Sequence, residues 1–204
     1  MFYETEDNRH GLPRDPFKSC IVPRPIGWIT TLSADGVVNL APYSFFNGVA
    51  SEPPMVMFAS NGPAPRPDKD TLKNCEETGQ FVANMATWDL REQMNRSSAP
   101  VPPEVEETTL AGLETEPARL VAPPRVKAVP IHLECAVHQV LDLPCTAPGG
   151  RNAMVLGRVL GVHIRDEVLT DGLVDLAKIT PIARLGYMDY TLVETIFAME
   201  RPSA

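Results

Sequence analysis

The chain has 204 residues, 44% hydrophobic and 22% charged, so it is long enough to bury a core without disulfides or metals. Its formal net charge of −8 disfavours nucleic acid or an anionic membrane as the main partner. The acidic N-terminus lacks the apolar segment of a secretory signal, and no apolar run reaches the ~18 residues that span a bilayer. We expect one cytoplasmic domain over residues 1–204 that binds neither nucleic acid nor a membrane.

Prolines and cysteines limit the fold further. The 21 prolines are spread along the chain, and proline breaks helix interiors and central strands, so short strands and many loops are expected. The four cysteines are widely spaced and form no CxxC pair, which predicts reduced, mostly buried thiols and no zinc site. They are Cys20, Cys75, Cys135 and Cys145.

The first third of the chain predicts three strands. They are rich in β-branched and aromatic residues and cover Gly27–Ser33, Val37–Tyr43 and Met55–Ser60. The Asp35-Gly36 turn joins the first two. Before them, Arg24 lies between two prolines, which hold it in an extended conformation. A polar and aromatic loop, Tyr43–Asn47, separates the second strand from the third.

The middle of the chain predicts short helices and a long excursion. Asp70 or Thr71 is expected to cap a helix that ends at Gly79. A strand over Gln80–Ala86 and a helix over Thr87–Arg96 follow. Residues 97–130 are rich in proline and acidic residues. They predict a solvated excursion over the barrel, with one short helix around Glu104–Ala111, although such loops also serve as lids or dimer contacts.

The last third predicts two long strands and a closing segment. The strands are expected over Ile131–Leu141 and Met154–Arg165, with bulges or bends at Gly157 and Gly161. A mixture of strand and helix over Val168–Lys178 leads to the closing segment Ile182–Leu192. Six or seven short strands joined by turns favour an antiparallel barrel.

Several common catalytic patterns are missing from the sequence. No GxGxxG follows a strand and no GxxxxGK[ST] occurs, which excludes Rossmann and P-loop frames. No Ser-His-Asp order or paired-carboxylate pattern stands out. His132, Glu134 and His138 could share one strand face, but cross-strand polar contacts explain them better than a metal does. His163 ends a strand and could contact a substrate.

A first candidate site is the start of the helix at Lys69, Asp70 and Thr71. Free N–H groups and the positive end of the helix dipole suit a phosphate there. Ser60 and Asn61 end the strand that leads to it. An ordinary helix cap with solvated lysines explains the same residues, so both interpretations stay open.

A second candidate site is the aromatic and hydroxyl loop Tyr43–Asn47. Phe45 and Phe46 are adjacent and cannot point to the same face of a strand, so at least one faces a ligand, a partner or solvent. Thr30 and Thr31 likewise point to opposite faces. Core packing of the rings with Ser44 satisfying a turn is the alternative to a flat, polar-rimmed ligand.

The ordered motifs PRPIGWITT, DG, NLAPYSFFN, EPP, KDTLKN with QFVANM, LGRVLGVHI and RLGYMDY resemble the flavin reductase-like family of FMN-binding split-barrel proteins, over roughly Ser19 to Leu192. The resemblance implies a mainly β, six-stranded antiparallel split β-barrel with a few short helices. It also implies a homodimer that binds FMN near its interface and uses NADH or NADPH. The long segment 97–130 departs from the family pattern.

The resemblance also implies which residues form the site. The cofactor-binding set would be Arg24, Thr30, Ser44, Phe45, Asn47, Ser60, Asn61, Lys69, Asp70 and Thr71. Arg184, Gly186 and Tyr190 match a further family motif; Arg184 and Tyr190, together with His163, are candidates for contact with substrate. No residue is expected to bind a metal.

The resulting prediction is an FMN-binding oxidoreductase, an NAD(P)H-dependent flavin reductase. Hydride transfer from nicotinamide to flavin N5 depends on the cofactor, which explains why no strong acid and base pair is visible. The protein could pass reduced flavin to a separate oxygenase component or reduce another small acceptor itself. The alternatives are a flavin carrier or sensor without turnover, and a barrel without cofactor that acts as an interaction module.

Overall fold

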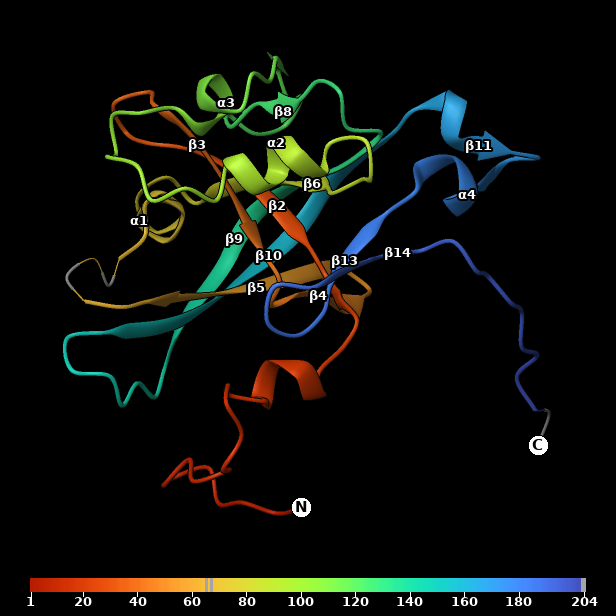
Figure 1. Ribbon diagram of the computed structural model, residues 1–204. Helices are drawn as coiled ribbons and strands as arrows, with labels where there is room; N and C mark the ends of the chain where they lie inside the picture. The colour runs from red at the N-terminus through yellow and green to blue at the C-terminus, as the bar shows by residue number, and fades with distance from the viewer. Residues whose placement is uncertain (65, 67, 203–204) are drawn as a thin grey trace.

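The computed structural model describes residues 1–64, 66 and 68–202. Seven strands form an antiparallel sheet in the order β3-β2-β6-β9-β10-β5-β4, which wraps around one core (Figure 1). The strands are β2 (Gly27–Leu32), β3 (Val38–Tyr43), β4 (Phe46–Ser51), β5 (Pro54–Gly62), β6 (Gln80–Met85), β9 (Ile131–Leu143) and β10 (Arg151–Ile164).

A second, smaller sheet pairs the segment before β2 with the C-terminal strands. It contains β1 (Arg24–Pro25), β13 (Ile182–Arg184) and β14 (Tyr190–Leu192). Two further pairs are β7 (Thr115–Glu116) with β8 (Arg125–Val126), and β11 (Leu169–Thr170) with β12 (Leu173–Val174). With helix α4 (Leu176–Ile179) directly after β12, the region Val168–Lys178 mixes strand and helix, as predicted.

Four short α-helices accompany the sheets in the described residues. They are α1 (Asp70–Thr78), α2 (Arg91–Arg96), α3 (Glu107–Leu110) and α4 (Leu176–Ile179). Helices α1, α2 and α3 lie over one side of the barrel, whereas the N-terminal segment leaves on the opposite side and the C-terminal residues extend away (Figure 1). No helix in the described part of the chain is long and apolar enough to cross a membrane.

Two predicted segments differ from the structure. The expected loop Tyr43–Asn47 is reduced to Ser44 and Phe45, because Phe46 begins β4, an edge strand paired with β5. Strand β4 is mostly exposed and shows no alternation of apolar and polar residues, so its sequence does not reveal it; it raises the strand count to seven. The predicted helix over Thr87–Arg96 is helical only from Arg91, since Thr87 forms a β-bridge with Pro181.

The excursion over residues 97–130 is solvated only in part, because several of its residues are buried against the sheet. Val121, Val126 and Val129 are buried, and the last two join a core with Trp28 on the outer face of the sheet. Trp28 Nε1 donates a hydrogen bond to Ser97 Oγ at 2.8 Å. Because apolar residues of the excursion alternate with prolines, no periodic pattern marks this buried face.

Three aromatic rings fill the centre of the barrel. Phe58 and Phe81 are fully buried and meet edge to face with ring centroids 5.4 Å apart. The centroid of the Tyr43 ring lies 4.9 Å from that of Phe58. Two thiols, Cys75 and Cys135, share this core, while Cys20 is exposed and Cys145 half-buried, so only half of the cysteines meet the expectation of burial.

The bulges predicted at Gly157 and Gly161 are confirmed by shifts in the pairing of β10 with β9. A Cβ atom at Gly157 would lie 2.3 Å from Cζ of Phe81, which is fully buried. We therefore expect Gly157→Ala to lower the free energy of unfolding by about 1–3 kcal/mol, as overpacking does.

The measurement is urea denaturation of Gly157→Ala, Phe81→Leu and the double variant. Phe81→Leu removes the clashing ring atoms, so the double variant should be less destabilised than the sum of the single changes. Additive losses would contradict a direct contact. Gly36→Ala is not a suitable control, because its φ of +84° strains any side chain.

Candidate functional site

Two adjoining pockets form a groove along the edge strand β3. The loop pocket, of about 510 Å³, lies between β3, the start of α1 and residues 97–101. The arginine pocket, of about 330 Å³, lies between the end of β3, the segment around Lys18 and residues 184–190. Pro42 and Ser98 line both pockets, so the groove is continuous from one to the other.

The N-terminus of α1 faces the loop pocket, which Lys69, Asp70 and Thr71 line. The sequence predicts Asp70 or Thr71 as N-cap, but Lys69 occupies that position, and within the described residues it makes no side-chain capping bond. The N–H groups of the first turn thus lack intrahelical partners at the positive end of the helix dipole. This is an arrangement that binds anions.

Hydroxyl groups gather beneath the loop pocket. Thr71 Oγ1 accepts a hydrogen bond from Asn39 Nδ2 at 2.7 Å. The Tyr43 hydroxyl lies near those of Thr71 and Ser60. Nevertheless, the buried hydroxyls of Tyr43 and Ser60 make no hydrogen bond of normal geometry within the described part of the chain. Tyr43 lines the loop pocket, whereas Ser60 does not. Because an unpaired buried hydroxyl costs free energy, the Tyr43 hydroxyl suits a polar ligand that supplies its missing partner.

Two basic residues, Arg66 and Lys69, line the loop pocket, and Lys69 is the one without a carboxylate partner among the described residues. Arg66 donates to both carboxylate oxygens of Asp70, at 3.0 and 2.8 Å, and to the Val101 carbonyl. Lys69 is exposed as a residue, yet its ammonium lies 5.8 Å from the centroid of the Tyr43 ring. Partial burial and the nearby Lys18 lower its pKa. A cation held beside another cation favours a bound anion.

Arg151 holds the loop before α1 in place. Its guanidinium bridges Asp68 at 2.8 Å, Glu76 of α1 at 2.7 Å and Asp142 of β9 at 2.7 Å. Asp68 directly precedes Lys69, so this cluster fixes the start of the helix relative to the β9–β10 hairpin. The sequence contains no local sign of it, because Asp68 and Glu76 are far along the chain from Asp142 and Arg151.

The arginine pocket brings together residues from both ends of the chain. Arg24 is buried, and its Nε lies 3.4 Å from the Ser44 hydroxyl. The Phe45 ring centroid lies 5.9 Å from its guanidinium carbon. Arg184 and Tyr190 line the same pocket. The predicted set Arg24, Ser44, Arg184 and Tyr190 is therefore grouped at one end of the groove, and Lys69, Asp70 and Thr71 at the other.

Six predicted site residues line neither pocket of the groove. Two of them are next to lining residues, Phe45 beside Arg24 and Ser60 beside Tyr43, and the other four lie farther away. Thr30 is fully buried and accepts a hydrogen bond from Asn84 Nδ2 at 2.7 Å, on the face of β2 that points to the outer core. Asn47 and Asn61 are exposed on β4 and β5. His163 contacts the fully buried Glu134 and lines none of the pockets described here.

Hydrogen bonds to Glu134 connect the excursion to strand β9. The Glu134 carboxylate accepts hydrogen bonds from the N–H groups of Arg119 and Leu120 at 2.8 and 2.6 Å. Burial opposes its charge, but these bonds and His163 lower its pKa. Next to it, His132 donates from Nε2 to the Val126 carbonyl, and burial lowers its pKa to about 4. The described residues contain no group of three or more potential ligands that could hold a metal.

His132 makes the stability depend on pH. Between its ordinary pKa of 6.5 and about 4, the unfolded chain takes up a proton that the folded protein excludes. The free energy of unfolding should therefore fall as the pH drops through this window, by roughly 2–3 kcal/mol at its acid end. Glu134 adds to the loss only below its ordinary value of 4.5.

Chemical denaturation of the wild type and His132→Gln over this pH window checks the effect. In the variant, the free energy of unfolding should depend much less on pH than in the wild type, from pH 6.5 down to 4.5, the ordinary pKa of Glu134. Equal slopes in both proteins would assign the pH dependence to another group.

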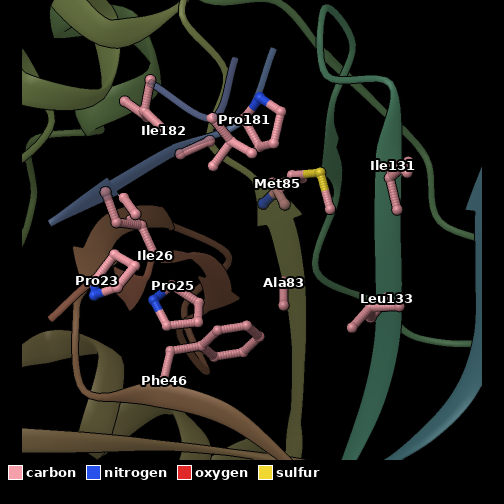
Figure 2. Close-up of a pocket in the computed structure, with 14 residues that line it drawn as sticks. Pro23, Pro25, Ile26, Phe46, Ala83, Met85, Ile131, Leu133, Pro181 and Ile182 are labelled. Carbon is pink, nitrogen blue, oxygen red and sulfur yellow. The ribbon is translucent and has the colours of Figure 1, made fainter. Parts of the chain in front are cut away.

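A third pocket is almost entirely apolar. It has a volume of about 330 Å³ and lies between β6, β9, Phe46 and the segments around Pro25 and Pro181 (Figure 2). Asn84 is the one polar side chain that lines it within the described residues. It therefore offers hydrophobic surface without groups that could orient a charged substrate or move a proton.

Asn39, Lys18 and Arg151 belong to the site environment but were not among the residues that the sequence predicts for it. Alternation along the DG hairpin could have indicated Asn39, which lies opposite Thr31. Lys18 and Arg151 carry no comparable local signal.

Comparison with known proteins extends this description. The chain matches the model of the flavin reductase like domain over residues 19–182. An uncharacterized protein of Halalkalibacterium halodurans is 36% identical over 185 residues, which cover 90% of this chain and 88% of the relative.

Three solved structures resemble the whole chain. Nitrilotriacetate monooxygenase component B from Bacillus cereus has a TM-score of 0.88 at 28% identity and covers 98% of both chains. The 2-nitrobenzoate 2-nitroreductase of Pseudomonas fluorescens has a TM-score of 0.85 at 26% identity, over 100% of this chain and 97% of that one. A putative flavin reductase with a split barrel domain from Shewanella frigidimarina has a TM-score of 0.83 at 23% identity, over 99% of this chain and 100% of that one, which confirms the predicted split β-barrel fold.

Proposed function

Because the chain belongs to the flavin reductase-like family, we propose that it is an FMN-dependent NAD(P)H oxidoreductase. The observation that carries the proposal is the loop pocket. It combines an uncapped helix start, the cation Lys69 and the buried hydroxyl of Tyr43, which makes no hydrogen bond of normal geometry within the described residues. A phosphate with a polyol chain would supply the missing partners of all these groups.

The chain's residues would bind and orient the cofactor, which supplies the hydride chemistry when bound. Lys69 and the first N–H groups of α1 would neutralise the phosphate. Thr71, positioned by Asn39, would add a hydroxyl contact. At the other end of the groove, Ser44 and Phe45 would border the ring, and residues 97–101 would cover the pocket and limit the access of water.

Two acceptors are compatible with the groove. The nitrilotriacetate monooxygenase component is named as part of an oxygenase system, which supports transfer of reduced flavin to a separate oxygenase. The 2-nitrobenzoate nitroreductase is named for reduction of a small aromatic acid, which supports direct reduction of such an acceptor.

The proposal includes a homodimer. The apolar pocket of Figure 2 is open at the surface, and its lining residue Val193 begins the C-terminal segment. In that segment Ile196, Phe197 and Met199 expose 56%, 77% and 83% of their surface. Burial of these residues against a second copy would remove apolar surface from water. Size-exclusion chromatography with light scattering tests it, and a monomer at micromolar concentration would refute it.

The absorbance spectrum tests the central proposal. Protein reconstituted with FMN should be yellow and should bleach when NADH or NADPH is added without oxygen. Protein that does not retain or bind FMN would refute it. FMN that binds but stays oxidised for minutes in a stopped-flow experiment would instead favour the alternative of a flavin carrier or sensor.

A further inference from the structure

The arginine pocket contains an arrangement that the fold alone does not explain. Arg24 of β1 and Arg184 of β13 are directly opposite each other in an antiparallel pair, so both side chains leave the same face. Like charges in this position destabilise a sheet. Burial of Arg24 and its closeness to Arg184 lower the pKa of Arg24, which reflects the same repulsion.

The hydrogen bonds of the two arginines do not balance their charge. Arg24 donates to the carbonyl oxygens of Lys18, Ile21 and Leu185. Arg184 donates to the Tyr187 carbonyl and the Tyr190 hydroxyl. All these acceptors are neutral.

No acidic side chain lines the arginine pocket in the part of the chain that the structure describes, although Lys18 adds a third cation. Neither arginine nor Lys18 forms an ion pair with a carboxylate of the described residues. In a chain with a net charge of −8, three gathered cations without a counter-charge point to a bound anion.

The surroundings of the cations indicate what kind of anion fits. Met94, Met188 and Tyr190 line the arginine pocket and also a neighbouring pocket of about 320 Å³, which Trp88, Arg91 and Glu92 line as well. Tyr190 lies with its ring centroid 4.4 Å from the Arg184 guanidinium carbon. Thioether and aromatic surfaces suit a flat ring, and a guanidinium fork suits a carboxylate or phosphate.

We propose that Arg184 and Lys18, together with the buried Arg24, form the anion subsite for the protein's second substrate, an organic anion with a flat ring. The subsite rests on the proposed function in one respect: Ser44 in the same pocket would place the substrate ring beside the flavin. The anion is either the carboxylate of an aromatic acid acceptor or the phosphates of the nicotinamide donor.

Calorimetric binding to the FMN-loaded protein tests this subsite with two matched probe pairs. One pair is 2-nitrobenzoate and neutral nitrobenzene. The other is NADH and uncharged N-benzyl-1,4-dihydronicotinamide, titrated without oxygen, so that flavin reduction is seen separately by absorbance. Arg184→Gln should lower the binding affinity of one anionic probe by about tenfold or more, whereas the affinity of its neutral counterpart should change by less than about twofold.

Controls separate this loss from misfolding and from loss of flavin. Arg184→Lys keeps the charge and should retain part of the affinity, and Arg158→Gln removes an exposed positive charge outside the groove and should change nothing. Thermal melting and FMN affinity are measured for every variant. Unchanged affinity for both anions in Arg184→Gln overturns the subsite.

Loss of FMN affinity with both anions unaffected also overturns it, because the cations would then serve the flavin. If the wild type does not bind FMN, the proposed function fails. The subsite is then judged by 2-nitrobenzoate binding to the flavin-free protein.

Discussion

Replacing Lys69 and Thr71 together with alanine is expected to weaken FMN binding by about tenfold or more. The double change removes the available cation of the loop pocket and the hydroxyl that Asn39 positions there. Charge-assisted contacts to a phosphate are among the strongest hydrogen bonds in proteins, so their loss should dominate the affinity. Fluorescence titration of FMN measures it.

Riboflavin and a second lysine provide the controls. Riboflavin lacks the phosphate, so its affinity should differ little between the wild type and the double variant. Lys73→Ala removes another lysine of α1, whose ammonium lies 3.8 Å from Glu77 and which does not line the loop pocket. It should leave FMN affinity within about twofold, because exposed pairs contribute little. Equal losses for FMN and riboflavin would place the phosphate elsewhere.

Phe58→Ala is expected to lower the free energy of unfolding by about 3–5 kcal/mol, the usual cost of emptying a buried aromatic site. The ring is fully buried between those of Tyr43 and Phe81, so neighbouring side chains cannot close the cavity without losing their own contacts. Urea denaturation at neutral pH measures the loss.

The same variant connects the core to the groove. Tyr43 packs on Phe58 with its ring and lines the loop pocket, so we also expect weaker FMN binding in Phe58→Ala. Phe197→Ala removes a ring that is 77% exposed and should change the stability of the single chain by less than about 0.5 kcal/mol. A loss below about 1 kcal/mol in Phe58→Ala would show that the barrel core can repack.

Local chemistry explains the parts of the fold that the sequence predicts correctly. Gly79 ends α1 in the left-handed conformation that glycine adopts freely. The DG turn joins β2 to β3, with Gly36 at a φ of +84°. Gly157 and Gly161 mark the bulges of β10. Each of these features depends on residues that are neighbours in the sequence.

The corrected parts depend on distant contacts. Strand β4 exists because β5 offers it hydrogen bonds, although its own residues are mostly exposed. Part of the excursion over residues 97–130 is buried because Val126 and Val129 pack with Trp28 on the outer face of the sheet. No pattern within either segment could have shown this.

The site divides in the same way. From the order of its motifs, the sequence determined the family, the barrel, and the helix start at Lys69, Asp70 and Thr71 as a candidate phosphate site. Contacts that form on folding place Arg24 opposite Arg184, hold the loop before α1 through Arg151, and turn Thr30 away from the groove. The physical reason is that charge repulsion, burial and unpaired hydroxyls are properties of groups brought together by folding, and a linear pattern does not record which distant groups will meet.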